Sequence, residues 1–336
     1  MIQESELKKI DSSQLLELNI MKFYGILLVV LGHVAFTYTP MALIKPAVSS
    51  EFMVGVKEII YAFHMPMFVF ISGCIFAWQL DIKHKSLNLE SLFIKKFRRL
   101  MIPYYAFGLL MVWPTLVVLG FRAPLHYLID GIILAMDPRH LWFVMALFII
   151  FIMFYVFRKL CFRFHIPILT LLPFALLLYL LPVHFPYLQL ENFKEYLLWF
   201  SIGYFFITHK RIIKGIALLA LIYMLSSSWI RDVLPPPFAH LFIKLSRALV
   251  GISIFYIISL NTQKITNSRI YQWISVNSFG IYLFHAMIIY WFEYTFSTYT
   301  INPILLSICI FTISLILSVF ATITVRKFHC SIIIGE

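Results

Sequence analysis

Ten apolar stretches, most of them long enough to cross a bilayer, recur along this chain and leave few other ways for it to fold. A spanning helix needs about 20 mainly apolar residues, since lipid offers the backbone no hydrogen bonds. Apolar residues fill 62% of the 336 positions and charged residues only 12%, which excludes an ordinary soluble domain. The sequence therefore predicts an all-α fold, a polytopic membrane helix bundle with about ten transmembrane helices. The expected spans are 19–38, 60–80, 100–121, 140–158, 166–182, 193–208, 212–229, 239–260, 277–296 and 302–325.

The distribution of positive charge between these spans predicts the topology. Among the 27 lysines and arginines, roughly three times as many fall on the side of the N-terminus as on the opposite side, and cytoplasmic loops are the ones that carry such an excess. We therefore expect both termini in the cytoplasm and a multi-pass protein of the inner (cytoplasmic) membrane. The net charge of +12 then reflects topology and indicates no nucleic-acid partner. The expected organisation is one transmembrane domain over 19–325, with cytoplasmic segments at 1–18 and 326–336.

The first span carries two residues that are costly in lipid, Lys22 and His33. Eleven residues separate them, which is close to three full helical turns, so they share one helix face about 16 Å apart along the axis. Intramembrane ionisable groups are functional by default, so both are candidate catalytic residues. The alternative is a core histidine that bonds a neighbouring helix.

The second span places His64 at a depth similar to that of His33, because the two helices run in opposite directions. Pro66 follows two residues later, removes a helical hydrogen bond and predicts a break beside the two histidines. A broken helix at this point favours a polar cavity, although an ordinary proline kink is the simpler reading of Pro66 alone. His64 joins the catalytic candidates.

A basic run stands at the cytoplasmic mouth of the third span. Lys96 and Arg99 are three residues apart and share a helix face, as do Lys95 and Arg98. Such pairs can bind phosphate groups, and arginine can do so in a bidentate manner. A phosphorylated acyl carrier from the cytosol would fit here. The competing interpretation is a set of snorkelling anchors that only mark the topology.

Weaker candidates lie toward the outer side. Arg139, His140 and Trp142 stand where the fourth span begins and could contact a sugar, or belong to an interfacial aromatic belt. His285 is expected near the middle of the ninth span, with Glu293 about two turns farther out. We group these five as substrate-binding candidates. The four cysteines have no metal-ligand spacing, and no metal is expected.

Several of these segments, in this order, resemble the membrane-bound acyltransferase-3 family of surface-glycan O-acyltransferases, including fucose 4-O-acetylase-like members. The matching pieces cover almost the whole chain and are specific together rather than singly. They are the basic residue and histidine eleven apart (Lys22, His33), Phe-His-Met-Pro with Phe-Ile-Ser-Gly (63–66 and 70–73), the basic run with Pro-Tyr (Lys96, Arg99, Pro103, Tyr104), His-Leu-Trp-Phe (140–143) and Ser-Phe-Gly-Ile-Tyr-Leu-Phe-His (278–285).

The resemblance implies transfer of an acyl group, commonly acetyl from acetyl-CoA, to a sugar hydroxyl of a cell-envelope glycan. It also adds Tyr104 to the donor-binding candidates. Two positions depart from the family pattern: Asn19 stands where an aspartate is common, and Lys96 replaces the first arginine of the basic pair. The acidic partner of Lys22 is thus left open.

The resulting hypothesis places acyl-CoA on the basic run and makes His33 the general base on the acceptor hydroxyl, as an imidazole suits that task at neutral pH. His64 would orient His33, stabilise the oxyanion or act as the base itself. A covalent acyl-histidine step remains an alternative. So does a different class of protein, a transporter or flippase for an acyl or glycan intermediate, since intramembrane histidines also serve proton relays. A hydroxyl of a capsule sugar, an O-antigen residue, a lipid-linked glycan or a small molecule would fit equally as the acceptor, and the sequence does not indicate the oligomeric state.

Overall fold

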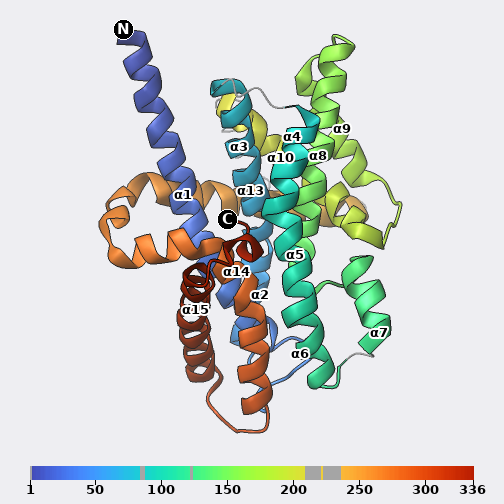
Figure 1. Cartoon of the computed structure of the whole chain (residues 1–336), viewed down its shortest axis with the longest axis vertical. Coiled ribbons are helices and arrows are strands. Elements are labelled where there is room, and N and C mark those ends of the chain that lie inside the picture. Colours follow the sequence, from blue (N-terminus) through green and yellow to red (C-terminus); the bar gives the residue numbers. More distant parts are fainter. Residues whose placement is uncertain (1, 84–87, 122–123, 209–220, 222–235) are drawn as a thin grey trace.

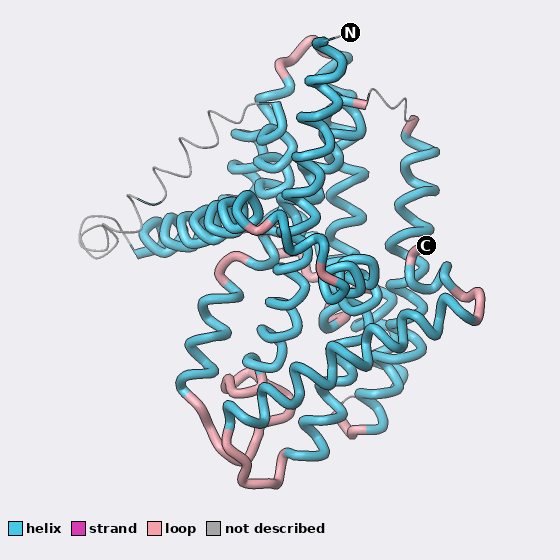
Figure 2. The backbone as a smooth tube through the Cα atoms, turned by 90° about the vertical axis from the view of Figure 1, so that its left-hand side faces the viewer, coloured by secondary structure: helices cyan, strands magenta, loops and turns pink. Residues whose placement is uncertain are grey.

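The computed structural model describes residues 2–83, 88–121, 124–208, 221 and 236–336, with side chains from residue 15 onward except at 124, 208 and 236–238. Within these residues every regular element is helical and no strand occurs (Figures 1 and 2). The predicted all-helical fold is therefore confirmed. The longer helices are α1 (Ile2–Phe36), α2 (Glu51–Tyr61), α3 (His64–Ala77), α8 (Trp142–Arg163), α9 (Leu171–Leu180), α10 (Leu190–Thr208), α13 (Pro236–Asn261), α14 (Arg269–Phe296) and α15 (Pro303–Lys327).

A series of short helices covers most of the described residues between α3 and α8. The α-helical pieces are α4 (Leu89–Lys96), α5 (Ile102–Phe107), α6 (Trp113–Val118) and α7 (Pro124–Tyr127). Wider π-helical turns join them or end them: η1 (Trp78–Ile82) follows α3, and η2 (Phe97–Met101), η3 (Gly108–Val112) and η4 (Leu128–Ile133) lie farther on. Short 3-10 helices complete the fold: η5 (Arg139–Leu141), η6 (Ile168–Thr170), η7 (Tyr187–Gln189), η8 (Gln263–Asn267) and η9 (Ser331–Ile334).

Seven helices among the described residues are long and apolar enough to cross a membrane, which makes this a multi-pass membrane protein. They correspond to seven of the ten predicted spans. Of the others, 166–182 coincides with a shorter apolar helix, Ile168–Leu180, and 193–208 with α10. The predicted span 212–229 lies outside the described residues except for position 221. The number ten stays a prediction.

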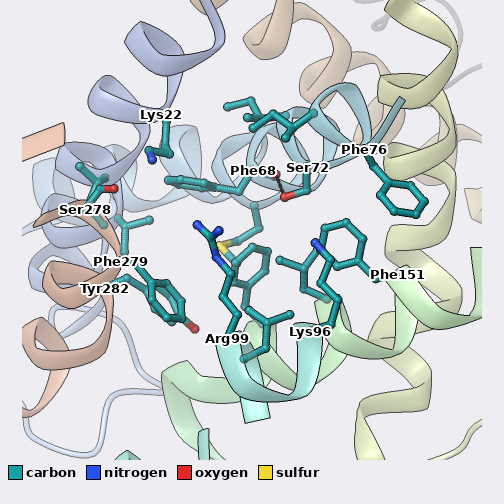
Figure 3. Close-up of a pocket in the computed structure, with 18 of the residues that line it drawn as sticks. Lys22, Phe68, Ser72, Phe76, Lys96, Arg99, Phe151, Ser278, Phe279 and Tyr282 are labelled. Atoms are coloured by element: carbon teal, nitrogen blue, oxygen red, sulfur yellow. Dashed lines mark hydrogen bonds between the residues drawn. The ribbon is translucent and has the colours of Figure 1, made fainter. Parts of the chain in front are cut away.

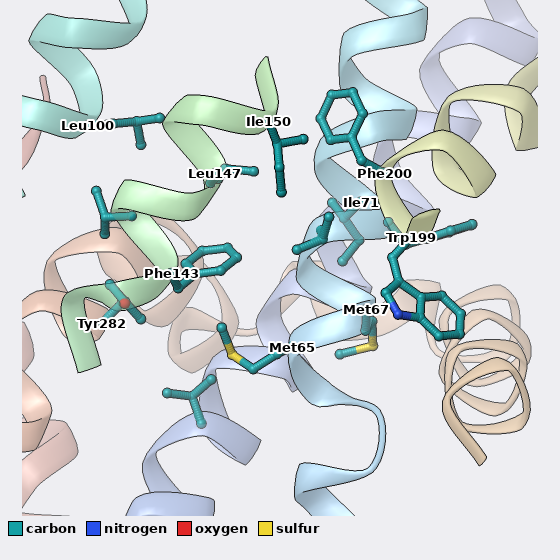
Figure 4. Close-up of a cluster of buried hydrophobic side chains, with 14 of the residues drawn as sticks. Met65, Met67, Ile71, Leu100, Phe143, Leu147, Ile150, Trp199, Phe200 and Tyr282 are labelled. Carbon is teal, nitrogen blue, oxygen red and sulfur yellow. The ribbon is translucent and has the colours of Figure 1, made fainter. Parts of the chain in front are cut away.

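Two features of the arrangement position the site. In both views α13 runs across the direction of α1 rather than along it (Figures 1 and 2). The antiparallel pair α14 and α15 packs against α1, and the C-terminal residues return to the middle of the molecule (Figure 1). Helices α1, α3, α8 and α14 thereby surround a common centre, where their buried apolar side chains interlock (Figure 4).

The closest helix contact joins α3 to α10 through two glycines. A methyl group added to Gly73 would stand 2.1 Å from the carbonyl oxygen of Phe200, and one added to Gly203 would stand 2.0 Å from that of Phe70. Small residues let membrane helices approach closely, and the gain is van der Waals contact rather than hydrophobic burial. The Sγ of Cys74 also donates to the Gly203 carbonyl. Helix α3 is thus held at a defined rotation about its axis.

The π-helical turn η2 has a local cause. Pro103, two residues after it, lacks an N–H, and its ring would clash with the Arg99 carbonyl in a regular α-helix. A wider turn relieves that clash and frees the carbonyl. The freed Arg99 oxygen lies against Gly335, where an added methyl group would stand 2.4 Å away and where φ is +76°. The basic run of the third span therefore sits on a wide turn that the C-terminal segment covers.

Candidate active site

An inner cavity of about 200 Å³ lies at the centre of the bundle (Figure 3). Its wall is mainly apolar, with three cations at one end. Lys22 enters from α1, Lys96 from the end of α4 and Arg99 from η2. The remaining lining residues are Ile26, Val29, Met65, Phe68, Ile71, Ser72, Ile75, Phe76, Gln79, Leu100, Phe143, Leu147, Phe151, Ser278, Phe279 and Tyr282.

A second cavity of about 390 Å³, here called the vestibule, adjoins the first, because Gln79, Lys96 and Arg99 line both. All four residues of the basic run line the vestibule, whereas a regular helix would divide them between two faces. The π-helical turn η2 alters the rotation per residue at this point. The rest of its wall is Leu92, Gly335 and Glu336.

Most of this positive charge is unneutralised. Arg326 holds the carboxylate of Glu336 through both of its oxygens, and this hydrogen bonding, aided by the charge of Arg99, lowers the pKa of Glu336. Among the described residues no carboxylate forms an ion pair with Lys22, Lys96 or Arg99. Converging cations without counter-charges make an anion-binding site.

Lys96 and Arg99 hold different positions in this site. The Lys96 ammonium lies 3.2 Å from the centre of the Phe151 ring, a cation–π contact. The Arg99 guanidinium points into the inner cavity on the side of Lys22 (Figure 3). Lys95 and Arg98 are exposed at the vestibule. Lys96 is the least exposed of the four, and Arg99, although exposed, also lines the inner cavity.

The inner cavity leads toward four histidines, one each on α1, α3 and α14 and one on η5, the 3-10 turn directly before α8. On α1 the lining residues Lys22, Ile26 and Val29 follow helical spacing, and His33 is the next residue on that face. On α8 the residues Phe151, Leu147 and Phe143 are followed in the same way by His140. On α14, Ser278 and Tyr282 lead to His285, and on α3 the lining ends at Met65, next to His64.

The histidines form one cluster at the far end. The ring of His33 lies 4.9 Å from that of His285, and the rings of His285 and His140 are 5.5 Å apart. Tyr61 joins His64 to the group, with ring distances of 6.3 Å to His33 and 4.8 Å to His64. His64, His140 and His285 are buried, whereas His33 is only partly so. Each of the other three histidines lies close enough to His33 to interact with it electrostatically.

Backbone hydrogen bonds determine the tautomer of the three buried histidines. A carbonyl oxygen can only accept, so the ring nitrogen facing it must carry the proton. His64 Nδ1 donates to the Ile60 carbonyl at 2.8 Å, His140 Nε2 to that of Leu283 at 3.0 Å, and His285 Nδ1 to that of Ile281 at 3.0 Å. In the neutral rings the second nitrogen is an acceptor. For His140 Nδ1 and His285 Nε2 that acceptor is buried and has no partner.

The break before His64 is confirmed: α2 ends at Tyr61 and α3 begins at His64. The break explains the first of these bonds, since His64 starts a helix and can turn its ring back to the carbonyl of Ile60.

A second polar group lies beyond the histidines, on the side away from the inner cavity. Glu293 is buried two turns after His285 on α14, lies close to Thr37, and has no partner for its Oε2. Arg139 lies at the start of α8 with its Nη2 3.2 Å from Asp137, while its Nε has no hydrogen-bond partner. Tyr290 lies close enough to Arg139, Asp137 and Glu293 to interact with them electrostatically. Buried polar groups without partners call for an explanation, and a bound ligand is one.

Some candidates stand apart from the cluster. Trp142 packs on Tyr196 of α10, with ring centres 5.2 Å apart, and lines neither cavity. Tyr104 is fully buried, donates to the Ile132 carbonyl at 2.8 Å and lines neither cavity. Asn19 is exposed, and Glu17 hydrogen-bonds Tyr256 rather than Lys22.

Sequence reasoning did not include several residues of this site. Tyr61 bridges two histidines, and Phe68, Phe143 and Tyr282 line the cavity next to the cluster. A usable signal was present for two of them, because Phe143 and Tyr282 each precede a candidate histidine or follow one by three positions on the same helix face. Among the described residues no group of three or more His, Cys, Asp or Glu side chains has a geometry that could hold a metal ion.

The fold and the site together define a multi-pass membrane protein that joins a cationic cavity to a buried histidine cluster. A family model described as an acyltransferase domain, that of the acyltransferase-3 family, matches residues 15–323. Comparisons with curated proteins and with solved structures find no match. The chain belongs to the acyltransferase-3 family, as its motifs predicted, and is a membrane acyltransferase.

Proposed function

We propose that this protein is an O-acyltransferase that moves a short acyl group, in the first place acetyl, from cytosolic acyl-CoA to a hydroxyl of a cell-envelope glycan. One observation carries the proposal: four helix faces that line a cation-headed cavity each continue to a histidine of one cluster. A donor entering past the cations would thus point its reactive end at His33.

The two cavities match the parts of a coenzyme A thioester, with cations for its phosphates in the vestibule and an apolar wall for its pantetheine arm farther in. The vestibule offers Lys95, Lys96, Arg98 and Arg99 to phosphate groups, and charge-assisted bonds to phosphate are among the stronger ones in proteins. The apolar wall of the inner cavity suits the slender, uncharged pantetheine arm. Lys22 lies at the same end of the inner cavity as Lys96 and Arg99, about 16 Å from His33 by helical rise. We therefore assign it to donor binding rather than to contact with the reacting carbonyl.

The transfer step is assigned to His33. A neutral His33 removes the proton of the acceptor hydroxyl, whose oxygen attacks the thioester carbonyl carbon. The carbon–sulfur bond breaks, and the CoA thiolate leaves and is protonated. His64, His140 and His285 surround His33 as neutral rings held by backbone carbonyls, which keeps them positioned to orient it or to pass on its proton.

The acceptor side is assigned to the polar group around Glu293 and Arg139, with His140 and His285 next to the reacting atoms. Sugars present many hydroxyls, each both a donor and an acceptor, and the unpartnered Glu293 Oε2, His140 Nδ1 and His285 Nε2 are acceptors without donors. Trp142, on Tyr196, would line the outer approach and stack on a sugar face.

A direct assay distinguishes this function from transport of an acyl or glycan intermediate. Purified protein in detergent is mixed with acetyl-CoA, with and without envelope glycan or lipid-linked sugar, and free CoA is measured. We expect CoA release that depends on the acceptor, together with an acyl ester on the glycan by mass spectrometry. Acceptor-dependent movement of substrate across vesicles without CoA release would contradict the proposal.

Reversal of one vestibule charge tests donor binding. Because Arg99 lines both cavities, Arg99→Glu is expected to raise the KM for acetyl-CoA by at least about tenfold, in line with the 1.5–3 kcal/mol of a charged hydrogen bond. Initial rates against donor concentration give the value. Arg163→Glu, an exposed arginine that lines neither cavity, is the matched control. An equal effect of both variants would reduce the basic run to a topology signal.

Replacement of the Glu293 carboxyl group tests acceptor binding. Glu293→Gln keeps the size of the side chain and changes an acceptor oxygen to a donor, so the KM for the glycan is expected to rise by about tenfold while the KM for acetyl-CoA stays unchanged. Glu58→Gln, on the exposed surface of α2, should change neither constant. A rise in the KM for acetyl-CoA alone would contradict the assignment of Glu293 to acceptor binding.

A further inference from the structure

Three aromatic rings form a row in the wall of the inner cavity, on the path toward the histidines. They are Phe68 of α3, Phe143 of α8 and Tyr282 of α14, here called the aromatic floor, and all three line the cavity (Figures 3 and 4). The rings of Phe68 and Phe143 are 6.2 Å apart, and those of Phe143 and Tyr282 are 5.7 Å apart. On the other side, Tyr282 lies 5.8 Å from His140 and 5.9 Å from His285.

The floor is held at both ends. The tip of Phe68 reaches α1, where a methyl group added to Gly25 would stand 2.8 Å from Phe68 Cζ, so a glycine is what leaves room for the ring. At the opposite end the Tyr282 hydroxyl donates to the backbone carbonyl of His140. The row of rings therefore extends from α1 through α3 and α8 to α14, and Tyr282 connects it directly to the cluster.

The position of the floor has a consequence for the donor. The cavity is lined as far as Val29 on α1, and His33 lies one helical turn beyond it. An acyl group that enters from the cations must therefore pass this row of rings to reach His33. Buried aromatic rings are bulky and closely packed, and such walls discriminate strongly against added methylene groups.

We propose that the aromatic floor of Phe68, Phe143 and Tyr282 sets the length of the acyl group that this protein transfers, admitting acetyl or propionyl and rejecting longer chains. This inference rests on the proposed function, since it concerns the same donor. The floor has a second effect, because the same rings exclude water that enters from the vestibule. Without them, water can attack the thioester carbonyl, break the carbon–sulfur bond and release a free carboxylic acid and the CoA thiol.

Phe143→Ala is the decisive variant, tested in the full-length protein. The values of kcat/KM are measured for acetyl-, butyryl- and hexanoyl-CoA with one glycan acceptor. One methylene in an apolar pocket changes discrimination by about 10- to 200-fold, so the acetyl-to-butyryl preference is expected to fall at least about tenfold. CoA release without acceptor should rise at the same time. Tyr282→Phe keeps the ring and should keep the preference.

Phe157→Ala serves as the control, because Phe157 is on the same helix, packs on Phe174 and lines neither cavity. Phe68→Leu is measured in parallel as a milder opening of the floor. The floor proposal is wrong if the folded floor variants transfer acetyl normally and keep both the chain-length ratios and the acceptor-independent CoA release of the unmodified protein. The proposed function would then still stand. Failure of the unmodified protein to transfer any acyl group overturns the proposed function and the floor with it.

Discussion

Replacement of His33 by glutamine is expected to lower acyl transfer by about 10²- to 10⁴-fold, the range that a positioned general base contributes. The reason is geometric as well as chemical. His33 is the only one of the four clustered histidines that is partly accessible, while the other three are buried and bound to backbone carbonyls. A glutamine keeps the polarity and much of the size but cannot accept the hydroxyl proton. Acyl-ester formation at saturating acetyl-CoA measures the loss.

Two comparisons make this result specific to the base. Binding of acetyl-CoA, followed by the thermal shift it produces, should survive His33→Gln, because the cations that bind the donor are about 16 Å away by helical rise. His240→Gln, an exposed histidine on α13, should retain full activity. A folded His33→Gln protein that turns over normally would move the base to His64 and leave the rest of the site in place.

Gly73→Ala is expected to lower the free energy of unfolding substantially, although it adds only one methyl group. A methyl group there would overlap the Phe200 carbonyl at 2.1 Å, and backbone on α10 cannot move aside as a flexible side chain can. Overpacking of this kind costs about 1–3 kcal/mol of unfolding free energy. Thermal denaturation in a single detergent, with loss of the folded fraction followed by size-exclusion chromatography, reports the change.

Gly55→Ala is the matched control, since nothing lies within 4 Å of the methyl group that it adds to α2. There alanine favours the helix by up to about 1 kcal/mol, so the two alanine substitutions should shift the denaturation temperature in opposite directions. Gly203→Ala, on the other side of the same contact, should behave like Gly73→Ala. Equal shifts for Gly73→Ala and Gly55→Ala would mean that α3 and α10 are not in close contact.

The structure gives Lys96, which replaces the first arginine of the basic pair, a different environment from that of Arg99. Lys96 rests its ammonium on the Phe151 face, an arrangement that uses a compact point charge, while Arg99 extends a planar guanidinium into the inner cavity. In the proposed function the bidentate contact to phosphate is therefore assigned to Arg99. In the same proposal Lys96 would contact a single phosphate oxygen where the vestibule and the inner cavity meet.

Much of the site followed from the sequence alone, because its main features are local. The apolar stretches predict membrane helices, and the eleven-residue spacing of Lys22 and His33 predicts their common face whatever the partner helices are. The break at His64 follows from Pro66. The basic run, read as two pairs on separate faces, was found as a group but not in its true arrangement.

What the tertiary structure alone decided concerns relations between helices. Sequence spacing says which residues share a face of one helix, but not which faces meet. The glycine contact at Gly73 and Gly203 sets the rotation of α3, and the π-helical turn η2 brings all four basic residues to one vestibule. The meeting of His33, His64, His140 and His285 depends on those rotations, since helical periodicity is a property of a single backbone whereas packing arises only between side chains distant in sequence.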